Sequence, residues 1–130
     1  MYCIILLSMF FLHIVDDFYL QGIFKDLKQK RWWEEHAPQE IYKNDYLVAL
    51  IEHSFSWSFV IHIPIILFMV SKGSILDSWI PLTIFGNMTI HAIIDDLKAN
   101  KLRINLITDQ LLHLVQIILI FILYIIILGI

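Results

Sequence analysis

The chain has 130 residues, of which 59% are apolar and 16% are charged, and its mean hydropathy is +0.77. A soluble domain would be about half apolar and about a quarter charged, so this composition predicts an integral membrane protein. The net charge of −3 excludes the basic surface of a nucleic-acid-binding protein, and the single cysteine, Cys3, excludes an internal disulfide framework and a thiolate metal cage.

Four apolar segments are long enough to cross a bilayer, whose core of about 30 Å requires about 20 helical residues. They cover approximately residues 1–22, 46–71, 74–97 and 104–130. The first segment has neither the basic start nor the cleavage site of a signal peptide, so we expect it in the mature fold. The sequence predicts an all-α membrane protein in which residues 1–130 form a single domain, a four-transmembrane-helix antiparallel bundle.

The basic residues are concentrated in two of the three connections, and the remaining connection contains only Lys72. The first connection contains Lys25, Lys28, Lys30, Arg31 and Lys43, and the third contains Lys98, Lys101 and Arg103. Because short cytoplasmic loops collect Lys and Arg, we expect both basic connections in the cytoplasm and both termini outside. This topology is that of a multi-pass protein of the cell's inner, cytoplasmic membrane.

The long first connection, residues 23–45, mixes aromatic and charged side chains. Phe24, Leu27, Trp32 and Trp33 alternate with lysines, an arginine and glutamates, which is typical of a short interfacial helix at the level of the lipid headgroups. Pro38 should end this helix. We favour an aromatic anchor that sets the height of the bundle; the alternative is a cover over a cavity that faces the cytoplasm.

Ionisable residues inside the four segments form pairs with helical spacing. The pairs are His13 with Asp17, His91 with Asp95, and Asp109 with His113. Members four residues apart lie on one helical face, and the reversed order in the last segment places every Asp on the cytoplasmic side of its His. His53 lies at the same depth as the paired histidines, on the order of 10–14 Å from the cytoplasmic ends. The sequence therefore predicts a layer of four imidazoles beside three carboxylates.

Such a layer suits one or two divalent metal ions, such as Zn, Mn or Fe. The candidate metal ligands are His13, Asp17, His53, His91, Asp95, Asp109 and His113. Seven ligands are too many for one tetrahedral ion, so either two ions bind or some carboxylates orient a ligating imidazole. The structural alternative is that the pairs are buried hydrogen bonds that join the helices.

Three further side chains are placed to support the ligands. Gln21 and Gln110 can hydrogen-bond to them, since Gln21 follows Asp17 by one turn on the same face. Lys98, three residues after Asp95, is either a phosphate contact or an anchor whose ammonium reaches the interface. We favour the anchor.

The remaining polar residues of these segments are expected to lie outside the layer. Asp16, Asp96 and Glu52 point about 100° away from the candidate ligands, toward headgroups or water. His62 has no acidic partner four residues away and is predicted to be structural. His36, in the first connection, is expected to face solvent.

The motifs resemble those of a known family. They are His13-x-x-x-Asp17-Phe18-x-x-Gln21, the lone His53, His91-x-x-x-Asp95-x-x-Lys98 and Asp109-Gln110-x-x-His113. In this order they are similar to the uncharacterised bacterial and phage membrane proteins of domain-of-unknown-function family 3307. The resemblance covers nearly the whole chain and implies the same four-pass unit and polar residues, but no activity. A looser similarity, by analogy only, is to inner-membrane metal-dependent hydrolases.

The leading functional hypothesis is a metal-dependent hydrolase of the cytoplasmic leaflet that cleaves a phosphoester or a lipid-linked substrate. Water activated by the metal would be the nucleophile, and Asp95 and Asp109 are the candidate catalytic carboxylates. The expected partners are the bilayer and a lipid-linked or phosphorylated small substrate, and no nucleic acid. The sequence leaves the oligomeric state and the identity of the metal open.

Two other classes of function use the same residues differently. An ion or proton transporter would bind and release its ion at the same layer, but the only polar residues further outward are His62, Asn87 and Gln116. A structural phage or bacterial membrane protein would use the layer only to hold its helices together.

Overall fold

The computed structural model describes residues 1–73 and 79–128, and these ranges contain helices and no strand. The helices in chain order are α1 (Tyr2–Val15), η1 (Asp16–Leu20), α2 (Phe24–Leu27), α3 (Lys30–His36), η2 (Glu40–Tyr42), α4 (Asp45–Ser71), α5 (Trp79–Ala99) and α6 (Leu106–Leu128). The predicted start of the third segment, at residues 74–78, and the last two residues of the fourth, 129–130, lie outside the described ranges.

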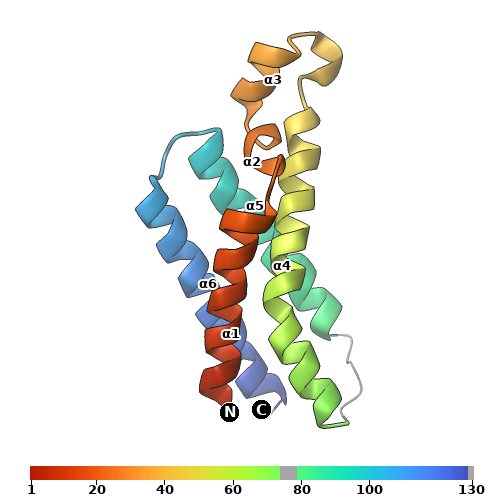
Figure 1. Cartoon of the computed structure of the whole chain (residues 1–130), viewed down its shortest axis with the longest axis vertical. Helices are drawn as coiled ribbons and strands as arrows, with labels where there is room; N and C mark the ends of the chain where they lie inside the picture. The colour runs from red at the N-terminus through yellow and green to blue at the C-terminus, as the bar shows by residue number, and fades with distance from the viewer. Residues whose placement is uncertain (74–78, 129–130) are drawn as a thin grey trace.

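Four long helices lie beside one another (Figure 1). α4 packs against α1 and α5, and α6 packs against α5 and α1, so the four helices enclose a common interior. α1 begins and α6 ends at one end of the molecule, here called the terminal end. The connections 21–44 and 100–105 lie at the opposite end, here called the loop end (Figure 1).

Much of the surface is apolar, and the interior contains buried charged and polar groups beside an apolar core. Large apolar side chains such as Phe11, Phe59 and Leu119 are exposed, whereas histidines and aspartates are buried. Three segments are long and apolar enough to cross a membrane: Tyr2–Leu20, Glu40–Ser71 and Leu106–Ile126. The described part of α5 is not among them; its last two turns contain Asp95, Asp96 and Lys98.

The apolar core lies toward the terminal end. It includes Met9 from α1, Ile61 and Ile65 from α4, Ile84 from α5 and Ile117 from α6, each at most 6% exposed. Pro64 lies within α4 without ending it. This apolar packing closes the terminal half of the interior, so the buried acidic and most of the buried imidazole groups lie nearer the loop end.

The prediction that Asp16 faces headgroups or water is wrong. After Val15 the backbone changes from an α-helix to the π-helical segment η1, and Asp16 and Asp17 are both buried. A π-helical turn contains more residues than an α-helical turn, so two successive carboxylates can face the interior. The hydroxyl of Ser56, on α4, donates a hydrogen bond of 2.9 Å to Asp16 Oδ1.

The first connection contains two short α-helices, α2 and α3, and the 3₁₀ turn η2. Gly22 has a φ of +49°, a left-handed conformation that glycine adopts readily, and here the chain turns from η1 toward α2. The indole of Trp33 donates to the carbonyl of Leu27 at 2.8 Å and joins α3 to α2. α3 ends at His36, two residues before Pro38, as the sequence predicts.

Candidate metal centre

All seven predicted ligands converge in the interior between α1, α4, α5 and α6. None of them is more than 5% exposed. α1 and η1 contribute His13 and Asp17, α4 contributes His53, α5 contributes His91 and Asp95, and α6 contributes Asp109 and His113. The i,i+4 spacing places each pair on the inward face of its helix, and the packing of the helices brings the pairs to one level.

Two groups within this layer have their ligand atoms close enough to hold a metal ion. The first group is Asp17, His53 and His91, with one ligand atom of each residue within 4.8 Å of the others. His53 Nε2 lies 3.4 Å from His91 Nε2 and 3.5 Å from Asp17 Oδ1. It also lies 3.4 Å from Asp95 Oδ2. One Nε2 atom thus has three potential ligand atoms around it at nearly equal distances.

The second group is His91, Asp95 and His113. His113 Nε2 lies 3.3 Å from Asp95 Oδ1 and 3.5 Å from Asp109 Oδ1, and its Nδ1 lies 3.2 Å from His91 Nδ1. Asp95 therefore faces His53 with one oxygen and His113 with the other. The Asp109 Oδ1 atom is buried and has no hydrogen-bond partner among the described residues.

His13 is arranged differently from the other three histidines. The indole N–H of Trp57 donates to its Nδ1 atom at 2.8 Å, and because an indole nitrogen is only a donor, the proton of the neutral imidazole is on Nε2. That nitrogen lies 3.1 Å from Gln110 Oε1, to which it can donate. Gln110 Nε2 then donates to Asp17 Oδ2 at 2.8 Å and to Asp109 Oδ2 at 3.1 Å. In this arrangement His13 orients Gln110, and Gln110 orients two carboxylates.

Trp57 is a central residue of the layer that the sequence analysis missed. Its ring is fully buried and stacks on His91 with a centroid distance of 4.0 Å and an interplanar angle of 17°. Its position four residues after His53 on the same face of α4 was the available signal.

Lys28 is a second missed residue, and it comes from the first connection. It is 7% exposed, and its ammonium lies 2.5 Å from Asp95 Oδ2. The Asn100 side chain fastens this segment to the end of α5, since its Nδ2 donates to the Lys28 carbonyl at 3.2 Å and its Oδ1 accepts from the Lys30 backbone N–H at 2.7 Å. This contact favours the cover over the anchor as the role of the connection.

The three supporting residues have different contacts. Gln110 bridges His13, Asp17 and Asp109, as described above. Gln21 Nε2 donates to the backbone carbonyl of Asp17 and not to its carboxylate. Lys98, for which we favoured an interfacial anchor, instead lies with its ammonium 2.7 Å from Asp109 Oδ2. The buried Asp109 carboxylate attracts the ammonium, and Lys98 is therefore directed toward the layer.

The residues expected outside the layer are distributed as follows. Glu52 and His36 are exposed, and His36 stacks on Trp32. Asp96 is 19% exposed and lies 2.8 Å from the Lys101 ammonium. His62 is fully buried in the apolar half, and its Nδ1 lies 2.6 Å from the carbonyl of Ser58.

A cavity of about 600 Å³ lies beside the layer at the loop end. Asp17, Lys28 and Lys98 line it on the side of the layer, and Lys25 lines it from α2. The layer is therefore adjacent to a space that could hold a small molecule or a lipid headgroup.

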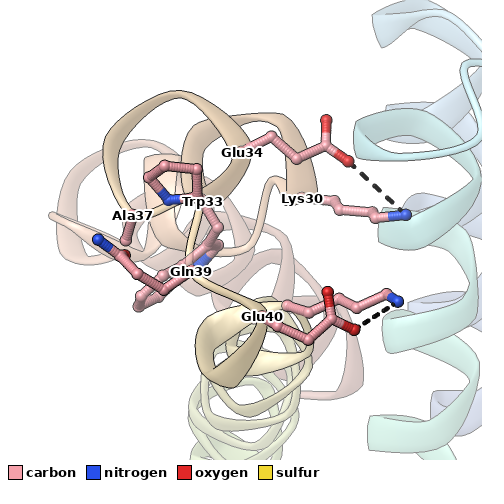
Figure 2. A pocket seen from close by; sticks show the side chains of 8 residues that line it. Lys30, Trp33, Glu34, Ala37, Gln39 and Glu40 are labelled. Carbon is pink, nitrogen blue, oxygen red and sulfur yellow. Dashed lines mark hydrogen bonds and ion pairs between the residues drawn. The ribbon is translucent and has the colours of Figure 1, made fainter.

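A smaller pocket of about 190 Å³ lies in the connection itself, around Trp33 (Figure 2). Lys43 lies 2.8 Å from Glu40, and Lys30 lies 3.7 Å from Glu34. Because these charges are already paired with each other, this pocket is a weaker candidate site than the layer.

No protein-family model matches this chain, and no curated protein or solved structure matches it either. The resemblance to family 3307 therefore stays a prediction, and the function rests on the chemistry of the layer.

Proposed function

We propose that the chain is a four-pass protein of a bacterial inner membrane whose His/Asp layer binds one or two divalent metal ions. The three apolar segments support membrane insertion, and α5 would be the fourth span because it packs between α4 and α6 and exposes Phe85, Ile90 and Ile93. With the basic connections in the cytoplasm, the layer and its cavity open toward the cytoplasmic leaflet.

The single observation that carries the metal proposal is the spacing around His53 Nε2. Ligand atoms at 2.0–2.1 Å from a tetrahedral ion are about 3.3–3.4 Å apart. The three contacts of this nitrogen, to His91, Asp17 and Asp95, are 3.4, 3.5 and 3.4 Å. Strong N–H···O hydrogen bonds would be about 2.7–3.2 Å long, and one nitrogen proton could not serve three partners.

The proposed assignment divides six of the seven residues between two positions. Asp17, His53 and His91 hold the first ion. His91, Asp95 and His113, with Asp109 beside them, form the second position, so His91 and Asp95 lie between the two. His13 acts through Gln110 on the orientation of Asp17 and Asp109. Outer residues of this kind fix the geometry of metal ligands.

We propose hydrolysis of a phosphoester or lipid-linked substrate as the activity. A bound divalent ion lowers the pKa of water and makes it a nucleophile near neutral pH. Asp109 is suited to accept the proton, because its Oδ1 atom is buried and accepts no hydrogen bond among the described residues, although His113 Nε2 is 3.5 Å away. Asp95 would ligate metal between the two positions. Lys98 lines the cavity beside the layer, where its ammonium could neutralise negative charge on a phosphoryl group.

Elemental analysis of detergent-purified protein tests this proposal. Wild type should contain about one to two equivalents of a first-row divalent metal, and His91→Ala should lose most of it because both groups use His91. His62→Ala and His36→Ala are the controls, since neither residue contacts the layer. Metal-free wild-type protein with unchanged thermal stability in chelator would refute the metal site and favour the structural role.

A second candidate function, ion or proton transport, is favoured by the buried polar residues outward of the layer. Gln116 and Asn87 are hydrogen-bonded to each other between α6 and α5, and Thr83 and Tyr124 are bonded one turn or more further out. His62 is buried beside Tyr124. Proton or metal flux in liposomes that Gln116→Leu abolishes would support transport. Absence of flux together with hydrolysis would support the enzyme.

A further inference from the structure

The cavity beside the layer has the charge of an anion-binding site. Among the residues that line it, Lys25, Lys28 and Lys98 are cationic and Asp17 is the single carboxylate. Lys28 is more than nine-tenths buried, so its ammonium is held in place by the fold. Each ammonium has three N–H donors, and the contacts of Lys28 and Lys98 with aspartates leave donors for a ligand.

One wall of the same cavity is apolar and is located where lipid would be. Phe18, Tyr19 and Leu106 line it, and they are 55%, 77% and 53% exposed. Phe18 and Tyr19 lie at the end of the apolar segment Tyr2–Leu20, and Leu106 begins the apolar segment Leu106–Ile126. A ligand in the cavity therefore meets lysines on one side and the edge of the bilayer core on the other.

We propose that this cavity binds a lipid with a phosphomonoester headgroup, with the phosphate against the three lysines and the acyl chains leaving past Phe18 and Leu106. This assignment deepens the proposed function, on which it rests for its catalytic meaning, because it names the substrate class. Lys25 forms no ion pair among the described residues, and Lys28 and Lys98 keep N–H donors that their aspartates do not use. These donors match the several oxygens of a phosphomonoester better than a zwitterionic headgroup. The phosphate would lie directly beside the metal ligand Asp17.

The backbone of the first connection positions two of the three lysines of the proposed headgroup site. The left-handed turn at Gly22 directs the chain from η1 across the loop end. Lys25 then lies in α2, and the residue that follows α2 is Lys28, so both lysines line the cavity beside the layer. Lys98 reaches the same cavity from the last turn of α5. Three cations from two elements thus surround one cavity, which an interfacial anchor alone would not require.

Lipid retention measured by native mass spectrometry tests the site without any assay of hydrolysis. Purified full-length protein is mixed with dioleoyl phosphatidic acid and dioleoyl phosphatidylcholine, which share their acyl chains. Wild type should retain the phosphomonoester lipid about tenfold or more better. Lys25→Gln should weaken this preference about fivefold, the effect of one basic residue on anionic lipid binding. Lys25 is exposed, so its substitution should not disturb the fold.

The control variant is Lys101→Gln, because Lys101 is exposed, is at the same end of the molecule and does not line the cavity. It should leave the preference unchanged. Equal retention of the two lipids, or equal effects of the two substitutions, would overturn the headgroup site. Displacement of phosphatidic acid by an equal concentration of inorganic phosphate would overturn the assignment to a lipid and indicate a soluble phosphate ligand.

Elemental analysis of the same samples, purified without chelator, separates this inference from the proposed function. A preference for phosphatidic acid in protein that binds no metal would support the headgroup site and refute the metal centre. Bound metal without a lipid preference would refute the headgroup site and leave the metal centre standing.

Discussion

Replacing Lys28 by Met tests the link between the first connection and the metal ligands. The substitution removes an ammonium that lies 2.5 Å from Asp95 Oδ2, in a pair whose side chains are only 9% and 2% exposed. Breaking a buried ion pair from one side costs about 3–5 kcal/mol, because it leaves an uncompensated buried charge. We expect a loss of this size in the free energy of unfolding of metal-free protein.

The neighbouring pair of Lys101 with Asp96 provides a matched control. Its distance is 2.8 Å, but its side chains are 52% and 19% exposed. Exposed ion pairs contribute about 0–1 kcal/mol, so Lys101→Met should cost less than about 1 kcal/mol. The two substitutions therefore remove the same group from adjacent aspartates and differ mainly in burial.

Added metal should change the stability of Lys28→Met more than that of Lys101→Met. If Asp95 is a metal ligand, a divalent ion replaces the lost ammonium as its counter-ion, and saturating Zn²⁺ should restore most of the stability of Lys28→Met. The assay is thermal and denaturant unfolding in detergent micelles, in chelator and in Zn²⁺. Equal costs for the two variants would refute the burial argument for Lys28. A cost for Lys28→Met that Zn²⁺ does not change would refute the role of Asp95 as a ligand.

Three further predictions concern topology and local structure. In a Cys3→Ser background, an impermeant thiol reagent on intact cells should label a cysteine at Lys72 and not one at Gln39; the reverse would invert the topology. Trp57→Phe should lower the free energy of unfolding in detergent by about 1–3 kcal/mol, because the buried Nδ1 atom of His13 loses the indole N–H that donates to it. A loss near zero would contradict that hydrogen bond. Gly22→Ala should cost about 1–2 kcal/mol at its φ of +49°, and a neutral effect would show that the turn is not left-handed.

The local pattern of the sequence was sufficient to predict which histidines and aspartates converge. An i,i+4 pair lies on one helical face whatever the surrounding structure is, and the reversal of Asp109 and His113 follows from the direction of the chain. Composition likewise predicted helices with apolar surfaces, since polar backbone groups in a bilayer must be paired within the segment. These conclusions need only helical geometry and the alternation of spans.

Only the tertiary structure decided which groups these residues contact. Trp57 and His13 are 44 positions apart and Lys28 and Asp95 are 67 apart, so their contacts depend on the rotation and separation of packed helices. The mixture of aromatic and charged residues assigned Lys28 to the interface, because a charged residue in a connection has no local signal for burial. The contact with Asp95 results from an acidic interior that attracts an ammonium, and no nearby residue in the sequence indicates it.

The sequence pattern also could not predict that the Asp16 side chain points into the interior. An expectation of 100° per residue holds for an α-helix, and the π-helical segment at Asp16–Leu20 changes that rotation at the point where two acids are adjacent. The sequence by itself therefore determined the helical spans and the convergence of the His/Asp layer, because both follow from local periodicity. The tertiary structure decided the hydrogen-bond partners, the inserted lysine and the cavity, because these depend on how the helices pack and where their backbone departs from the regular helix.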